Sequence, residues 1–245
     1  MLAELLARSG KVLLDSVPPD GRKYWAARFW DRAAAEQHPL LREHFLSQKD
    51  TIGKYLEKYG AETGQVLEFA CGTGEFTGLA ATRTAAKSIT ALDISQQGLD
   101  IVRGRVQHED LKLVLGDFWA EHDLGTADLV MCVDAIHHLG DVREVLQRLK
   151  TFMAPGGIFV GNLWTGDNFH DFERKRYGTF NHLRRTAGFF STAVVIRASG
   201  GRMKTGAYRT QLLTSAEGTA ILNDVFGEVL ELDVHPHFMS FVATA

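Results

Sequence analysis

The chain has 245 residues, of which 45% are hydrophobic and 23% are charged, and its formal net charge is −3. This composition is that of an ordinary globular protein, and the weakly acidic charge argues against a general nucleic-acid binder. The two cysteines, Cys71 and Cys132, are too few for a disulfide framework and lack metal-ligand spacing, so we expect small buried residues. Charges interrupt the N-terminal apolar residues, and no apolar run approaches the ~20 residues of a membrane span. We therefore expect a cytoplasmic protein with no membrane partner.

Residues 1–60 are predicted to form an N-terminal helical cap, broken once at Pro18-Pro19-Asp20-Gly21. Aromatic residues follow the break at a spacing that places them on one helix face: Tyr24, Trp25, Phe29 and Trp30. Such a stripe packs against the main domain or covers a pocket, with a ring near a bound cation, and the two roles are compatible. We predict that Tyr24, Trp25 and Phe29 contact the substrate.

Apolar strands alternate with helices from residue 61 to 165. The predicted strands are 65–69, 89–93, 111–115, 128–133 and 157–163, and the predicted helices are 75–85, 95–106 and 141–153. Ser95 and Asp141 are suitable helix N-caps, and Pro155-Gly156-Gly157 is expected to end the helix over 141–153. This alternation implies parallel strands with helices on both faces.

The C-terminal segment 213–245 is expected to complete this core with a helix over 215–226 and a strand pair over 228–233 and 238–243. The predicted fold class is therefore α/β, with a doubly wound, mostly parallel, seven-stranded Rossmann-like sheet. The N-terminal cap forms a lid on it, and residues 166–212 form an inserted substrate cover. Two histidines in the last turn, His235 and His237, are expected to be surface residues.

A glycine-rich turn follows the first predicted strand in the run Val66-Leu67-Glu68-Phe69-Ala70-Cys71-Gly72-Thr73-Gly74. A strand, a tight turn and a helix N-terminus together present backbone N–H groups to a ligand, and glycines let the backbone approach closely. A dinucleotide pattern would require glycine at position 77, which is Thr77. Asp93 ends the second strand, where a carboxylate accepts hydrogen bonds from ribose hydroxyls.

Two further groups follow later strands. Asp117 and Phe118 place a carboxylate and a ring where an adenine would lie, and Asp134, His137 and His138 follow the fourth strand. Histidine accepts a proton at neutral pH, which suits a general base. A metal site made from Asp134 and the two histidines is the less favoured interpretation.

These motifs, in order, resemble those of class I S-adenosylmethionine-dependent methyltransferases of the small-molecule type. The matching segments are Glu68 to Gly74, Leu92-Asp93-Ile94, Gly116-Asp117-Phe118, Asp128-Leu129-Val130 through His138-Leu139, and Leu149 through Gly157. The resemblance covers roughly 60–163 and departs from the family pattern at Ala70, where the first glycine is replaced. It implies S-adenosyl-L-methionine as cofactor and S-adenosyl-L-homocysteine as product.

The resemblance also implies roles for residues. Glu68 would orient the methionyl ammonium, and Asp134 would lie near it or orient a histidine. Asp93 would bind the ribose hydroxyls, and Asp117 the adenine amine. The remaining expected cofactor contacts are Ala70, Cys71, Gly72, Gly74, Ile94, Phe118 and Val133. His138 is the favoured catalytic base, with His137 as the second candidate.

The segment 166–212 carries nine basic and three acidic residues, a net charge of +6 that leaves −9 for the rest of the chain. It either recognises a carboxylate or phosphate of the acceptor, or forms a solvated face or a subunit contact. Aromatic residues interleaved with the basic ones make nucleic acid a weaker option. We predict substrate contacts by Trp164, Arg174 and Tyr177.

The expected function is transfer of a methyl group from S-adenosylmethionine to an O or N atom of a small molecule, in secondary metabolism. Two alternatives stay open: a methyltransferase acting on tRNA or a peptide, and an S-adenosylmethionine-binding protein without methyl transfer. The expected partner is a small-molecule acceptor, which an anionic group would match to the basic segment. The chain is expected to be a monomer or a homodimer.

Overall fold

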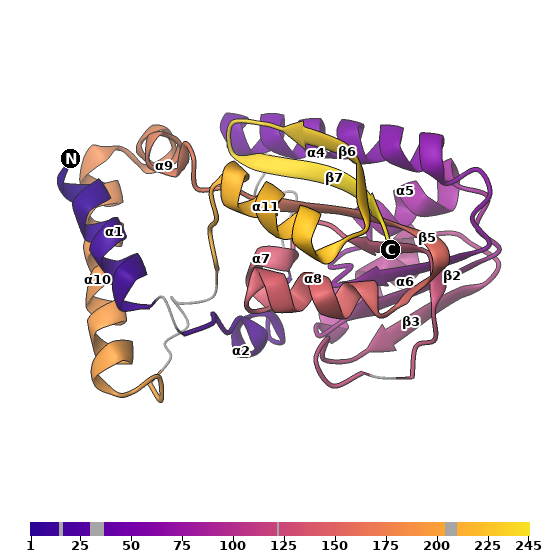
Figure 1. Ribbon diagram of the computed structural model, residues 1–245, viewed down its shortest axis with the longest axis horizontal. Helices are drawn as coiled ribbons and strands as arrows, with labels where there is room; N and C mark the ends of the chain where they lie inside the picture. Colours follow the sequence, from indigo (N-terminus) through magenta and orange to yellow (C-terminus); the bar gives the residue numbers. More distant parts are fainter. Residues whose placement is uncertain (15–16, 30–36, 122, 204–209) are drawn as a thin grey trace.

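The computed structural model describes residues 1–14, 17–29, 37–121, 123–203 and 210–245, and within them a seven-stranded sheet forms the centre of the molecule (Figure 1). The strand order is β3-β2-β1-β4-β5-β7-β6. The strands are β1 (Gln65–Phe69), β2 (Ser88–Asp93), β3 (Leu111–Leu115), β4 (Ala127–Cys132), β5 (Met153–Trp164), β6 (Glu228–Val234) and β7 (Phe238–Thr244). Neighbouring strands from β3 to β5 are parallel, whereas β7 is antiparallel to β5 and β6. The predicted fold class is confirmed.

Helices cover both faces of this sheet. The helices around it are α4 (Pro39–Tyr59), α5 (Glu75–Arg83), α6 (Gln96–Arg105), α7 (Ile136–Leu139), α8 (Val142–Lys150) and α11 (Ser215–Val225). Successive strand residues point to opposite faces, so Leu129 and Met131 pack with α4 and α5, while Val130 and Cys132 pack with α8 and α11. Every β4 residue except Asp128 is buried, as a parallel strand covered on both faces requires.

Helix caps act at two predicted positions. The Ser95 hydroxyl accepts a hydrogen bond from the Gly98 backbone N–H, at 3.3 Å, at the start of α6. The Asp141 carboxylate accepts from the backbone N–H groups of Arg143 and Glu144, at 3.0 and 3.3 Å, at the start of α8. Both side chains satisfy backbone donors that have no partner within the helix.

The prediction was wrong at the end of α8. The helix ends at Lys150, and Pro155-Gly156-Gly157 lies inside β5 rather than at a helix terminus. The pairing of β5 with β4 shifts register there, from Ala127 opposite Met153 to Leu129 opposite Ile158. Proline and glycine belong in such a bulge because it leaves residues without partners and accepts the positive φ of Gly156, +75°.

The N-terminal segment contributes to two separate places. Helix α1 (Leu2–Leu13) packs along α10 (Thr179–Ala198), which follows α9 (Phe169–Tyr177), and Figure 1 shows these helices to one side of the sheet. By contrast, α4 packs on the sheet, and α2 (Arg22–Trp25) is a single short turn of helix. The domain boundaries predicted from the sequence stay a prediction. Trp30, Lys204 and Arg209 lie outside the described residues.

The predicted surface position of the two C-terminal histidines was wrong. His235 and His237 are half-buried, and the His237 ring stacks on His44 of α4 with 4.6 Å between the ring centroids. Phe172 of α9 packs on the same His237 ring, at 4.9 Å, so this cluster joins α9 to the core. In the part of the chain that the structure describes, no helix is long and apolar enough to cross a membrane.

Candidate active site

A cavity opens where the carboxyl ends of β1, β2, β3 and β4 meet. Parallel strands bring the loops that follow them to one edge of the sheet, where α/β folds bind ligands. The walls come from six parts of the chain. The residues are Gly21, Arg22, Trp25, Arg28 and Phe29; Phe45; Ala70 to Thr73, Glu75 and Phe76; Leu92 to Ile94; Gly116 to Trp119; and Val133 to Ala135, His138 and Leu139. Motifs that are distant in the sequence thus form one site.

The glycine-rich turn is held by backbone conformation and by Asp93. Ala70 and Gly72 both have positive φ, +54° and +55°. The Asp93 carboxylate accepts from the backbone N–H of Gly72 and from that of Ser95, each at 2.8 Å. Burial raises the pKa of Asp93 above its ordinary value, while these hydrogen bonds act in the opposite direction. Apart from the chain neighbours of Gly72, no atom of the described residues lies within 4 Å of the point where Gly72 would carry a Cβ, which leaves space for a ligand.

Glu68 lies beneath this turn. Its side chain is buried and accepts a hydrogen bond from the Thr77 hydroxyl at 2.5 Å. Burial raises the pKa of Glu68 to about 8, with a smaller contribution from the nearby Asp93 charge. Among the described residues, Glu68 and Gly74 do not line the cavity. At position 77, where a dinucleotide pattern has glycine, the Thr77 hydroxyl thus donates a hydrogen bond to the buried Glu68 carboxyl group.

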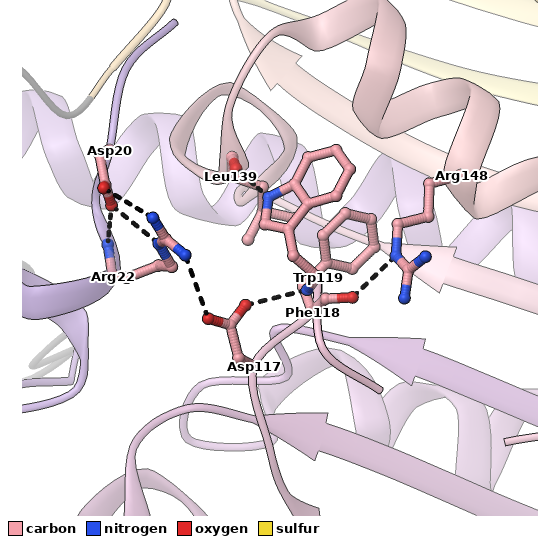
Figure 2. A network of polar contacts seen from close by, with 7 residues as sticks. All are labelled: Asp20, Arg22, Asp117, Phe118, Trp119, Leu139 and Arg148. Carbon is pink, nitrogen blue, oxygen red and sulfur yellow. Dashed lines mark hydrogen bonds and ion pairs between the residues drawn. The ribbon is translucent and has the colours of Figure 1, made fainter. Parts of the chain in front are cut away.

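The β3 loop forms a connected wall around Asp117 and the next two residues (Figure 2). The Asp117 carboxylate accepts from the Trp119 backbone N–H at 2.9 Å, and the Trp119 indole donates to the Leu139 carbonyl at 2.7 Å. Arg148 of α8 donates to the Phe118 carbonyl at 2.8 Å and lies over the Phe118 ring. These bonds tie the loop to α7 and α8, so both rings are held in place on the cavity wall.

The N-terminal segment reaches this wall through Arg22. Its guanidinium binds the Asp20 carboxylate at 2.9 Å and lies 3.7 Å from Asp117, as Figure 2 shows. These opposite charges hold the pKa of Arg22 above its ordinary value, with Asp20 the main cause. The contact brings the segment after the Pro-Pro break over the cavity, as expected for a lid.

Asp134 follows β4 with a positive φ of +57°. Its carboxylate accepts from the Trp164 indole N–H and from the Gln48 side-chain amide, the latter at 3.5 Å. Burial raises the pKa of Asp134 to about 7, partly offset by these two donors. Trp164, a predicted substrate contact, does not line the cavity within the described residues and instead orients Asp134.

The two histidines after β4 differ in position. His137 is buried, its Nδ1 accepts from the Trp164 backbone N–H at 3.3 Å, and burial holds its pKa well below the ordinary value. His138 lies on the cavity wall, with its Nδ1 3.0 Å from the Thr210 hydroxyl and its ring beside Trp25. Among the described residues, no three His, Cys, Asp or Glu side chains are arranged to hold a metal ion.

The other predicted substrate residues divide between the cavity and the helices beyond it. Trp25 and Phe29 line the cavity, and Tyr24 packs edge-on against Trp25 with 4.9 Å between the ring centroids. Arg174 forms an ion pair with Glu4 of α1, and Tyr177 contacts Arg176 and Arg185. Within the described chain, Arg174 and Tyr177 are not part of the cavity wall.

Sequence reasoning missed several cavity residues. Arg28 lines the cavity with its guanidinium 4.5 Å from the Tyr24 ring centroid. Glu75 is buried at the start of α5 and pairs with Lys49 at 3.2 Å and Arg105 at 2.5 Å. Trp119 could have been predicted from its position next to Phe118, and Arg28 from its position among the aromatic residues of the N-terminal segment. The partners of Glu75 come from distant helices and carry no local signal.

Comparison with known proteins agrees with the resemblance to methyltransferases. A family model described as a methyltransferase domain matches residues 66–157. The chain is 29% identical over 145 residues to a ubiquinone biosynthesis O-methyltransferase of Cronobacter sakazakii, covering 56% of each chain. It is 21% identical over 128 residues to a malonyl-(acyl-carrier protein) O-methyltransferase of Priestia megaterium, covering 52% of this chain and 45% of that protein. The chain spans about half the length of these relatives.

A solved structure shows the same fold. The N-methyltransferase NodS of Bradyrhizobium japonicum, in complex with S-adenosyl-L-homocysteine, superposes with a TM-score of 0.58 at 15% identity, covering 91% of this chain and 95% of NodS. Residues 66–157 therefore match a methyltransferase domain, the chain has the same fold as this methyltransferase, and the resemblance that the motifs indicated is confirmed.

Proposed function

We propose that this protein binds S-adenosylmethionine in the cavity and transfers its methyl group to an O or N atom of a small, anionic molecule. The observation that carries the proposal is the convergence of the glycine turn, Asp93, Asp117-Phe118 and His138 on one cavity. A place in secondary metabolism is part of the proposal.

The residues present fit the cofactor. The open space at Gly72 accepts an atom that a Cβ would otherwise fill. Asp93 retains acceptor capacity for ribose hydroxyls, since Oδ2 accepts from the Gly72 N–H, Oδ1 accepts from the Ser95 N–H, and each oxygen has a further lone pair. Phe118 and Ile94 offer apolar surface for a base. Asp134 lines the cavity and provides a carboxyl group toward a positively charged ligand.

S-adenosylmethionine supplies a methyl group on a positively charged sulfonium sulfur. The chain has to hold the acceptor in line, exclude water and remove the acceptor proton. His138 is placed for the last task, because it is the histidine on the cavity wall. When Nδ1–H donates to the Thr210 hydroxyl, Nε2 keeps its lone pair and accepts the proton of a hydroxyl or ammonium acceptor.

An anionic acceptor is supported by arginines that the sequence analysis did not single out. Arg22 and Arg28 both lie on the cavity wall, and Arg22 is occupied by Asp20 and Asp117. Arg28 forms no ion pair with any residue that the structure describes, so we assign it to the acceptor's carboxylate or phosphate. The aromatic rings of Trp25, Phe29 and Trp119 supply apolar surface beside it.

The test is to measure binding and turnover separately. Calorimetry with S-adenosyl-L-homocysteine should show one site per chain. S-adenosyl-L-homocysteine formation should then be followed with phenols and amines that carry or lack a carboxylate. Binding without turnover on any small acceptor would overturn the small-molecule assignment. Turnover on tRNA or a peptide would establish the first alternative, and no turnover with any acceptor the second.

A further inference from the structure

Large apolar side chains that remain exposed gather on α1, on α10 and just after α10. Of twelve such residues in the described chain, eight lie there: Met1, Leu2, Leu5, Val12, Phe180, Val194, Val195 and Met203. Phe180 is 77% exposed and Val12 is 75% exposed. The other four, Leu46, Leu115, Leu232 and Val234, are scattered over the main domain. Concentration of this kind marks an interaction surface, whereas single exposed apolar residues do not.

The packing of α1 on α10 uses only one side of each helix. Leu14 packs with Ala193 and Ile196, and a Cβ on Gly10 would lie 2.6 Å from Phe189. The stripe Phe180, Leu183, Ala187, Phe190 and Val194, at three- and four-residue spacing, runs along a different side of α10. Phe180 and Val194 are exposed, and the three residues between them are half-buried. This second side of α10 is thus apolar, and it is exposed at Phe180 and Val194.

Unpaired arginines accompany these apolar residues. α10 carries Arg184, Arg185 and Arg197 and no acidic residue. Arg184 follows Phe180 by four residues and Arg197 follows Val194 by three, so each lies beside an exposed apolar side chain. On α1, Arg8 lies between Leu5 and Val12 in the same way. Within the described residues, Arg8, Arg184 and Arg197 form no ion pair, whereas Arg185 pairs with Glu173.

Acidic side chains near these helices are already paired. Glu4 binds Arg174, Glu173 binds Arg185, and Asp171 binds Lys175. The first two pairs join α9 to α1 and to α10, whereas Asp171 and Lys175 both lie on α9. The exposed surface of α1 and α10 therefore carries both apolar and cationic side chains.

We propose that α1 and α10 dock the protein on the surface of an anionic lipid bilayer. A helix with apolar and arginine side chains together lies in the interface, with the apolar groups at the acyl boundary and the guanidinium groups among the phosphates. A second copy of the chain fits less well, because a two-fold contact through this face would bring like-charged arginine rows together. The arginines also prevent α10 from spanning the bilayer, in keeping with the absence of a spanning helix in the described chain.

The experiment is co-sedimentation of the full chain with vesicles. Phosphatidylcholine vesicles are compared with vesicles of phosphatidylcholine mixed with phosphatidylglycerol, at low and high salt. Binding to the mixed vesicles only, weakening with salt, is expected. Equal binding to both, or to neither, overturns the proposal.

Two variant pairs locate the surface. Arg184→Glu with Arg197→Glu should reduce binding by at least about tenfold, while Lys87→Glu with Lys112→Glu makes the same charge change elsewhere and should have no such effect. Phe180→Ser with Val194→Ser should weaken binding likewise, whereas Leu115→Ser with Leu232→Ser should not. Equal losses in the control pairs overturn the proposal. The proposal is also overturned if sedimentation velocity shows that the protein is a dimer and that the double variant Phe180→Ser with Val194→Ser is a monomer. Circular dichroism checks that each variant is folded.

Discussion

The side of the cavity proposed to hold the cofactor and the side proposed to hold the acceptor are built in different ways. On the cofactor side, Asp93, Asp117 and Phe118 sit at strand ends and are held by backbone hydrogen bonds. On the acceptor side, Arg28 and Phe29 come from a short segment that touches the core through Arg22. The comparison teaches that the part proposed to bind the constant ligand is held by hydrogen bonds at the strand ends. The part proposed to select the acceptor is attached to the core through side-chain contacts such as Arg22 with Asp117 and Trp25 with His138.

The largest effect on turnover is expected from a change at His138, which lies on the cavity wall beside Trp25. His138→Gln should lower turnover by roughly 10²- to 10⁴-fold because the acceptor proton loses its base. The affinity for S-adenosyl-L-homocysteine should stay the same, as calorimetry would show. His108→Gln, a matched change at the far end of β2–β3, should leave both quantities unaltered. Wild-type turnover in His138→Gln would remove the histidine from the chemistry.

Next in size is Asp93→Asn on the cofactor side. The change removes the charge that holds the Gly72 N–H and would bind ribose, a loss of ~2–3 kcal/mol or roughly 30- to 150-fold in cofactor affinity. Asp100→Asn, on the exposed side of α6, serves as control. Calorimetry decides the matter, and unchanged affinity in Asp93→Asn would refute the cofactor assignment at this position.

On the acceptor side, Arg28→Ala should raise KM for a carboxylate-bearing acceptor about tenfold through loss of one charge-assisted contact. The cofactor affinity should not change. Lys23→Ala removes a neighbouring exposed charge that does not line the cavity and should be silent. An equal rise in KM for uncharged acceptors would mean that Arg28 supports the lid rather than recognising an anion.

The pH dependence of stability tests the buried carboxylates. Because the pKa of Glu68 is raised to about 8 in the folded protein, folding favours its protonated form, and stability is lost as pH rises from its ordinary pKa toward 8. The free energy of unfolding of Glu68→Gln, relative to that of the wild type, should therefore rise by up to ~1.4 kcal/mol per pH unit between about pH 5 and 8. Denaturant melts of the ligand-free proteins measure this difference. A difference that is constant with pH would contradict it.

The smallest expected effect concerns Ala70. Its φ of +54° is unfavourable for alanine but not for glycine, so Ala70→Gly should raise the free energy of unfolding by at most ~1 kcal/mol. Ala70→Val should destabilise the protein by more, because a β-branched residue is poorly accommodated at positive φ. Thermal melts compare the two variants. A less stable Ala70→Gly would show that the alanine methyl contributes packing that outweighs the strain.

Local patterns were sufficient for the sheet and for the cofactor side. Strand periodicity, the glycine turn and acidic residues at strand ends depend on neighbours in the sequence, and the sheet brings these ends together whatever the loops contain. His138 illustrates the limit. Sequence favoured it over His137 only weakly, and burial of His137 beneath Trp164 now separates the two.

Only the tertiary structure decided where the described residues of the basic segment 166–212 pack. Arg174 and Tyr177, predicted at the acceptor, instead pack among α1, α9 and α10, since Glu4 neutralises Arg174 from the other end of the chain. Arg22 and Arg28 lie on the cavity wall because the Pro-Pro break returns the chain over the sheet edge. Long-range pairings of this kind leave no periodicity in the sequence. The sequence by itself therefore determined the fold and the cofactor motifs, and the structure decided which other side chains line the cavity.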